Sequence, residues 1–293
     1  MDSPQYQRGK KEFLTKKTFD RSRPSRPSNA GNNSFNSNKP QFSGLIKKLA
    51  RLKYDKGRLE ASQFLIEGPK IIKDILNVSK GIIKEVFTGP EFSDTETLSL
   101  IRKHGIPVTK FTQDEMTYLA DTQANQGLIG VAYFSTLKPN WASARYITLV
   151  DRVQDPGNVG AIFRTSLALG MDAVLLGKGS CEAYNPKVVR SSVGAMLRTP
   201  FESGVDLESK ISFLRQKGFT ILATSSHTSF TLETVKLRKK VALIISNEGE
   251  GIDERTLSLA DATIKIPLKN EMESLNVSVA HGILCHQIIN SRD

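Results

Sequence analysis

The sequence near its carboxyl-terminal end reads Ile266–Pro267–Leu268 and, after a polar loop, Glu273–Ser274–Leu275–Asn276–Val277–Ser278–Val279–Ala280–His281–Gly282–Ile283. A short β-branched run ends at a proline, and an apolar helix then begins at Ser or Asn. Open α/β sheets place their ligand sites where the carboxyl end of a strand faces a helix N-terminus. Capping the helix needs one small polar residue, and this loop offers two, Ser274 and Asn276. The loop therefore predicts a ligand site attached to a buried helix.

The composition favours a soluble cytoplasmic protein. The chain has 293 residues, which is enough for one large domain or two modest ones with a sizeable core. No run approaches the length of a membrane-spanning helix, and the first residues lack the apolar segment of a signal peptide. Cys181 and Cys285 are the two cysteines and have no paired spacing. They fit a reducing cytoplasm and argue against a disulfide framework.

The net charge of +11 is concentrated at one end of the chain. Residues 1–60 contain 15 Lys and Arg against 5 Asp and Glu, whereas the remainder has 26 against 25. This imbalance predicts an arm that binds a polyanion, with nucleic acid as the favoured partner and a solubilising tail as the alternative. Residues 1–42 are rich in Ser, Asn, Pro, Arg and Lys and poor in large apolar residues, so we expect a disordered basic arm. Order should begin near Ser43.

Residues 43–138 show the pattern of a small α/β domain. After a helix over residues 43–52, we expect strands at 64–66, 82–87, 108–111 and 128–134 and helices at 69–76, 95–103 and 113–120. Lys138–Pro139–Asn140 then breaks the alternation and predicts a linker. A unit of about a hundred residues is a normal domain size.

Residues 139–293 alternate apolar strands with helices. We expect strands at residues 146–150, 173–176, 219–223, 241–245 and 264–266 and helices at 158–169, 186–196, 207–217 and 277–290. Continuous apolar strands between helices are typical of a parallel sheet covered on both faces. The predicted fold class is therefore α/β in both parts of the chain.

Polar residues gather in three loops that follow strands of this second part. The first reads Asp151–Arg152–Val153–Gln154–Asp155–Pro156–Gly157–Asn158–Val159–Gly160–Ala161–Ile162–Phe163–Arg164–Thr165. Here Pro–Gly turns the chain, Asn158 is placed to cap a helix, and small residues at 160 and 161 permit close approach near Arg164. The second loop is Ser246–Asn247–Glu248–Gly249–Glu250–Gly251. The third contains Ser274 and Asn276.

Together these loops resemble the three sequence motifs of the SpoU (TrmH) family of RNA 2′-O-ribose methyltransferases, within the SPOUT superfamily. The resemblance covers residues 146–290, with all three motifs in order. Residues 64–134, beginning Phe64–Leu65–Ile66–Glu67–Gly68, resemble the L30e-like substrate-binding domain that precedes the catalytic domain in many members. The implied organisation is a basic arm (1–42), an L30e-like RNA substrate-binding domain (43–138) and a SPOUT methyltransferase domain (139–293).

The resemblance implies S-adenosylmethionine as methyl donor, RNA as substrate, a homodimer, and a C-terminal trefoil knot that general topology rules disfavour. By motif position, the cofactor is held mainly by backbone groups of Ser246, Ile266 and Leu275, with Thr224 and Gly249 nearby. The implied catalytic positions are Arg164, Ser274 and Asn276, supported by Asn158 and Glu248. The family often has Gly where this chain has Ser246, and a backbone contact survives that exchange if the side chain turns away.

Methyl transfer from a sulfonium to a ribose hydroxyl is an in-line displacement, so alignment supplies much of the rate enhancement. Arg164 matches the position given to the base in this family. Because a guanidinium is effectively never deprotonated, we prefer that it binds the substrate phosphate and stabilises the developing alkoxide. Asn276 and Ser274 then orient the ribose. Both roles for Arg164 remain open at the level of sequence.

The sequence therefore predicts an S-adenosylmethionine-dependent RNA 2′-O-methyltransferase, with 23S-type ribosomal RNA favoured over transfer RNA as the substrate. The rival from another class is a non-catalytic RNA-binding or ribosome-assembly protein of the same fold. His281, Cys285 and His286 suggest a metal at first sight, but further ligands at suitable spacing are missing from the sequence. We expect no metal and favour packing in the core or at a subunit interface.

Overall fold

The computed structural model describes residues 42–291 apart from 79–80, 124, 136, 226–227 and 248–250. The predicted disordered basic arm, residues 1–42, lies outside the described residues except for Phe42, whose ring stacks on Tyr118 with centroids 4.2 Å apart. The predicted first helix is present, and the Ser43 hydroxyl caps it by accepting a hydrogen bond from the Ile46 N–H at 3.4 Å.

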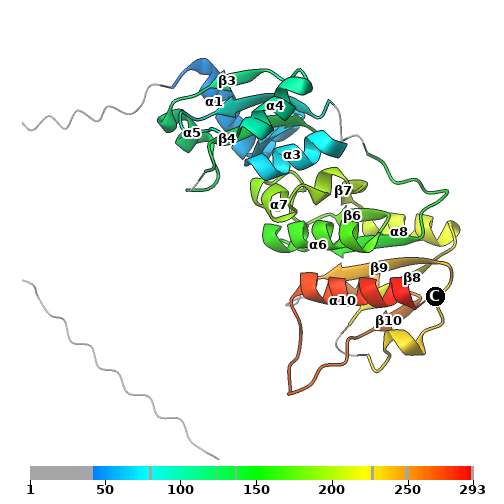
Figure 1. Ribbon diagram of the computed structural model, residues 1–293. Coiled ribbons are helices and arrows are strands. Elements are labelled where there is room, and N and C mark those ends of the chain that lie inside the picture. Colours follow the sequence, from blue (N-terminus) through cyan, green and yellow to red (C-terminus); the bar gives the residue numbers. More distant parts are fainter. Residues whose placement is uncertain are drawn as a thin grey trace, which may run out of the picture. The chain divides into compact units, whose positions relative to one another are not determined.

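The first part of the described chain is a four-stranded sheet with helices on both faces (Figure 1). Its strands are β1 (Gln63–Glu67), β2 (Ile83–Thr88), β3 (Val108–Lys110) and β4 (Leu128–Tyr133), in the order β1-β4-β2-β3. Its helices are α1 (Gly44–Ala50), the 3-10 helix η1 (Arg51–Lys53), α2 (Asp55–Ala61), α3 (Pro69–Val78), α4 (Thr95–Lys103) and α5 (Gln113–Leu119). Strand β4 is antiparallel to β1 and β2, and β3 is parallel to β2.

Side-chain alternation explains the two layers around this sheet. Phe64 and Ile66 of β1 are buried in one hydrophobic cluster with residues of α3 and α4, whereas Leu65 is buried in another with residues of α1 and α5. Because successive strand residues point to opposite faces, the apolar run of β1 serves both layers. Helix α2 was not predicted, and the preceding helix is shorter than predicted because it tightens into η1.

The second part is a six-stranded sheet in the order β10-β8-β9-β5-β6-β7, and every neighbouring pair is parallel. Its strands are β5 (Tyr146–Asp151), β6 (Ala173–Gly177), β7 (Phe201–Val205), β8 (Phe219–Thr224), β9 (Lys240–Ser246) and β10 (Ala262–Ile264). Its helices are α6 (Pro156–Leu169), α7 (Pro186–Ser191), α8 (Leu207–Gln216), α9 (Glu254–Ser258) and α10 (Val277–Asn290), with 3-10 helices η2 (Ala195–Leu197) and η3 (Leu232–Thr234). The predicted α/β fold with a parallel sheet is confirmed.

Both faces of this sheet are covered, which is why its strands are apolar throughout. Val150 is buried with residues of α6, α7 and α10, whereas Ile147 and Leu149 are buried with residues of α8 on the other face. A strand that is buried on both sides has no solvent-facing positions, so its sequence does not alternate. The trefoil knot implied by the resemblance stays a prediction.

Some predicted boundaries are wrong. The helix predicted at 186–196 ends at Ser191, because Val193 and Gly194 adopt positive φ values of 50° and 77° before η2 begins. The strand predicted at 264–266 is β10, which ends at Ile264. Ile266 therefore lies in the loop after the strand. Strand β7 and helix α9 were not predicted, because both are short and β7 contains polar Glu202 and Ser203.

The two parts of the described chain share contacts. Buried Arg58 of α2 donates from Nε to Glu182 at 3.0 Å, and the Tyr184 ring stacks on Phe134 with centroids 3.9 Å apart. The Tyr184 hydroxyl accepts a hydrogen bond from the Ser135 N–H at 2.8 Å, and burial raises its pKa to about 12. The predicted linker around residue 138 therefore joins two parts that also meet through side chains. In the described ranges, no helix is long and apolar enough to cross a membrane.

Candidate functional site

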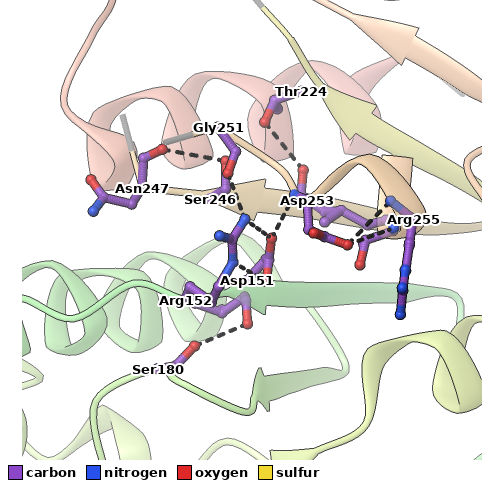
Figure 2. Close-up of polar contacts among 12 residues, drawn as sticks. Asp151, Arg152, Ser180, Thr224, Ser246, Asn247, Gly251, Asp253 and Arg255 are labelled. Carbon is purple, nitrogen blue, oxygen red and sulfur yellow. Dashed lines mark hydrogen bonds and ion pairs between the residues drawn. The ribbon is translucent and has the colours of Figure 1, made fainter. Parts of the chain in front are cut away.

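The carboxyl ends of four adjacent parallel strands lie along one edge of the second sheet. Register pairs Asp151 with Ser246, and Thr224 with Ile264. The Thr224 hydroxyl donates to the Ile244 carbonyl at 3.3 Å, so two of the predicted cofactor-binding residues, Thr224 and Ser246, end neighbouring strands (Figure 2). The Ser246 hydroxyl donates to the Asn247 carbonyl at 3.5 Å. Its hydroxyl is therefore engaged with the adjacent backbone, and the backbone contact to the cofactor at this residue stays a prediction.

Two helices begin side by side at this edge. The Asn276 Nδ2 donates to Asn158 Oδ1 at 2.9 Å, and the Asn276 Oδ1 accepts hydrogen bonds from the Ser278 N–H at 3.0 Å and the Ser278 hydroxyl at 2.7 Å. One side-chain amide thus caps α10 and ties it to the first turn of α6. The first and third motif loops, predicted to converge, are in direct contact here.

Asn158 was predicted to cap α6, and this prediction is wrong. The cap is Asp155, whose Oδ1 accepts from the Asn158 N–H at 2.9 Å, and Pro156 takes the first helical position. This hydrogen bond is the largest cause of a lowered pKa of Asp155, and the hydrogen bond from the Lys187 side chain is the second largest. Asp directly before Pro was the sequence signal for the true cap. Because Asp155 caps the helix, the Asn158 side chain is available to contact Asn276.

Glycine in the first motif is explained by helix packing. A Cβ on Gly160 of α6 would lie 1.9 Å from the Ser191 Oγ and 2.8 Å from the Val188 carbonyl oxygen of α7. No side chain fits at such distances, so the predicted close approach at this residue is confirmed. The spacing Asn–x–Gly therefore combines a residue that faces the site with one that lets α7 support the helix.

Four predicted site residues offer polar groups that have no protein partner within the described part of the chain. The side chains of Arg164 and Ser274 are exposed, and in the described ranges neither makes a hydrogen bond or an ion pair. Ile266 and Leu275 are half-buried loop residues, and there their backbone groups also lack partners. Glu248 and Gly249 lie outside the described residues. Within the described residues, no hydrogen bond joins Arg164 to Ser274, so their convergence stays a prediction.

Sequence reasoning missed a charged pair at the centre of this edge. Asp151 is 4% exposed, at the end of β5, and Arg152 binds it with Nε at 3.2 Å from Oδ1 and Nη2 at 3.1 Å from Oδ2. Arg152 Nη2 also donates to the Gly251 carbonyl at 3.0 Å, and the Asp253 N–H donates to Asp151 Oδ2 at 3.3 Å (Figure 2). The sequence signal was an acid directly after a continuous apolar strand.

Beneath α10, a buried histidine joins the helix to the sheet. His281 Nε2 lies 3.0 Å from the Thr148 hydroxyl and 3.1 Å from the Cys285 thiol, and it is 3.5 Å from the Ser166 hydroxyl. Burial lowers the pKa of His281 to about 4, so the ring is neutral at neutral pH. His281 and Cys285 therefore pack in the core, while His286 is exposed on the same helix. Among the residues that the structure describes, no group of three or more His, Cys, Asp or Glu is arranged to hold a metal.

Fold and site define an α/β protein in which polar residues and two helix N-termini gather at the carboxyl ends of a parallel sheet, the place where open α/β sheets bind ligands. Residues 145–286 match the family model of the SpoU rRNA methylase family, and residues 44–130 match the MRM3-like substrate binding domain. The 23S rRNA (guanosine(2553)-2′-O)-methyltransferase RlmP of Bacillus subtilis is 33% identical over 83% of this chain and 95% of its own length. The chain therefore belongs to the SpoU rRNA methylase family.

Other relatives agree. The 23S rRNA (guanosine-2′-O-)-methyltransferase RlmB of Coxiella burnetii is 28% identical over 78% of this chain and 96% of its own length. The crystal structure of an RNA 2′-O ribose methyltransferase superposes with a TM-score of 0.73 at 26% identity, covering 85% of this chain and 96% of that one. The SpoU methyltransferase AviRb of Streptomyces viridochromogenes, crystallised with AdoMet, shares the fold with a TM-score of 0.77 at 22% identity, over 86% and 98% of the two chains.

Proposed function

We propose that this protein is an S-adenosylmethionine-dependent methyltransferase that modifies a ribose 2′-hydroxyl in 23S-type ribosomal RNA. The observation that carries the proposal is the Asn276–Asn158 hydrogen bond of 2.9 Å, which joins the first and third motif loops at the carboxyl edge. Family membership and the named activities of RlmP and RlmB support the same reaction and substrate.

The residues at the edge fit the cofactor. A nucleoside with a charged methionine tail needs backbone donors and acceptors on an apolar floor, which is what Ile266 and Leu275 present, half-buried and without protein hydrogen bonds in the described ranges. We assign cofactor binding to these two residues and Ser246, with Thr224 and Gly249 nearby. When bound, S-adenosylmethionine supplies an electrophilic methyl group on a sulfonium.

In this proposal, the side chains at the same edge act on the RNA. Arg164 is exposed and has no acidic partner among the described residues, so its guanidinium is available for the phosphate of the target nucleotide and for the alkoxide that develops at the 2′-oxygen. Ser274 and Asn276 orient the ribose, and Asn158 holds Asn276 in place. Glu248 completes the proposed set of supporting residues.

A homodimer in the cytoplasm is part of this proposal. The family resemblance supports it, and Val279 on the first turns of α10 is 50% exposed, as expected of an apolar residue at a subunit contact. Light scattering of the purified chain tests the dimer. A monomer at micromolar concentration would contradict this part without affecting the assignment of the reaction.

The reaction is tested by incubating the protein with S-adenosylmethionine carrying a labelled methyl group and, separately, ribosomal and transfer RNA from cells that lack the protein. We expect label in a large-subunit ribosomal RNA and its mapping to one ribose. If only transfer RNA is labelled, the substrate is transfer RNA, the alternative named above, and not ribosomal RNA. If calorimetry detects no binding of S-adenosylmethionine at millimolar concentration, the non-catalytic RNA-binding alternative is favoured.

A further inference from the structure

The backbone of Arg152 has a conformation that favours glycine. Its φ of 52° lies in the left-handed region, where the Cβ of an L-residue is crowded. Arg152 directly follows β5, and a glycine there would make the same turn without strain. A strained residue that persists beside a candidate site points to a role for its side chain.

The Arg152 side chain joins two segments that are far apart in sequence. Its guanidinium binds Asp151 through Nε and Nη2, and Nη2 also donates to the Gly251 carbonyl at 3.0 Å. Gly251 is itself held, because its N–H donates to the Asn247 carbonyl at 3.1 Å. The same Asp151 carboxylate accepts from the Asp253 N–H. The charged pair therefore connects the end of β5 to the residues that lead from β9 into α9.

A neighbouring turn packs close to the aliphatic part of the Arg152 side chain. A Cβ on Gly179, after β6, would lie 3.2 Å from the Arg152 Cγ, and Gly179 itself has a φ of +85°. The Ser180 hydroxyl donates to the Val150 carbonyl at 3.1 Å and fixes this turn against β5 (Figure 2). The Arg152 side chain, which is 31% exposed, thus lies among segments that follow three strands, β5, β6 and β9.

We propose that Arg152 is a positioning residue that holds Gly251 and Asp253 beside Ser246 and thereby sets the affinity for S-adenosylmethionine. This inference rests on the proposed function. Segments that are ordered before a ligand arrives do not have to be ordered by it, so the ligand binds more tightly. Without the guanidinium, the buried Asp151 loses its charge partner and Gly251 loses its anchor.

The test is Arg152→Gly, which removes the side chain and relieves the backbone strain together. We expect the dissociation constant for S-adenosylmethionine to rise on the order of tenfold, the loss expected for a hydrogen bond to a charged group. Tm should fall, because Asp151 is left without its charge partner, and the relief of backbone strain offsets only part of this loss. KM for the cofactor should rise with it, and kcat at saturating cofactor should change little. Arg152→Lys retains one charge and should recover part of the affinity.

The matched control is Ser62→Gly. Ser62 is exposed at the end of α2, with a φ of 50°, so this variant relieves the same kind of strain far along the chain from the edge. It should raise Tm and leave cofactor affinity unchanged. A readout without cofactor is amide hydrogen exchange at Gly251 and Asp253, which should become faster in Arg152→Gly and stay slow in Ser62→Gly.

The outcomes separate the two proposals. If the unaltered protein does not bind S-adenosylmethionine, the proposed function fails, and the exchange rates still decide whether Arg152 holds these amides. If the unaltered protein binds the cofactor and Arg152→Gly binds it equally well, the positioning role is wrong.

Discussion

The two edges of the six-stranded parallel sheet differ in how their polar groups are satisfied. At the amino edge, Asp172 Oδ2 accepts from the N–H groups of Arg145 and Tyr146 at 2.7 and 2.8 Å, and Asp261 Oδ2 accepts from the Ile221 N–H at 2.8 Å. At the carboxyl edge, Ile266 and Leu275 leave backbone groups without partners among the described residues. Because half-buried polar groups without partners are costly, the carboxyl edge is suited to a ligand and the amino edge to stability.

The edges also differ in charge. An open hollow of about 550 Å³ at the amino edge is lined by Arg215, Lys236 and Arg238 and by a single carboxylate, Asp261, which Arg215 already binds at 2.8 Å. The carboxyl edge instead combines small polar side chains and helix N-termini with a paired charge, Asp151 with Arg152. The net charge after residue 60 is close to zero, but this total hides a basic surface at the amino edge of the sheet.

The largest expected effect separates chemistry from cofactor binding at the carboxyl edge. Arg164→Ala should lower the methylation rate by about 10²- to 10³-fold, the loss typical of a group that stabilises transition-state charge. Cofactor affinity measured by calorimetry should not change. Arg164→Lys distinguishes the two roles of the arginine, because residual activity with a shifted basic limb in the pH–rate profile would favour the base. Full activity of the alanine variant would remove Arg164 from the site.

Next in size is the hydrogen bond between the two helix starts. Asn276→Ala should lower activity about tenfold and lower the free energy of unfolding by about 1 kcal/mol, because it removes both the Asn158 contact and the helix cap. Asn276→Ser keeps a capping oxygen but lacks the Nδ2 donor. Chemical denaturation should therefore show recovered stability in the serine variant while activity stays low. Recovery of both would mean that Asn276 acts only as a cap.

Between the edges, His281 should make stability depend on pH. Burial lowers its pKa to about 4 from the usual value of 6.5, so the unfolded chain binds the proton more readily. Above pH 6.5, the pKa of His281 in the unfolded chain, its neutral ring contributes fully to the free energy of unfolding. This free energy falls by about 3 kcal/mol as the pH drops from 6.5 to about 4. In urea unfolding, His281→Gln should lose this component, whereas His286→Gln, on the exposed face of the same helix, should retain it. Identical profiles for the two variants would contradict the prediction.

The smallest effect is expected at the amino edge. Lys236→Gln combined with Arg238→Gln should leave cofactor affinity unchanged, because these residues lie at the opposite ends of the strands from Ser246 and Thr224. When RNA affinity is measured over a salt series, the slope of its logarithm against the logarithm of salt concentration should become shallower by at most about two units, one for each cation removed. Weaker cofactor binding in this variant would show that the two edges are not independent.

Local patterns in the sequence were sufficient for most of the fold. Continuous apolar runs predicted the buried parallel strands, and Ser43 and Asn276 predicted two helix starts, because caps and strand burial depend on nearby residues. Prediction failed at the ends of two elements, where apolar residues continue past the last residue of a helix and of a strand. Residues 193 and 194 end a helix that the apolar pattern continued, and Ile266 lies beyond the strand assigned to it.

The sequence by itself determined the class of protein, because three ordered motif loops and the alternation of strands and helices are local properties of the chain. It also singled out Asn158 and Asn276, although it assigned Asn158 the wrong local role. Only the tertiary structure decided that these two side chains touch, and that Arg152 binds Gly251, 99 residues along the chain. Strand order brings such residues together, and strand order depends on how all the apolar surfaces are buried at once.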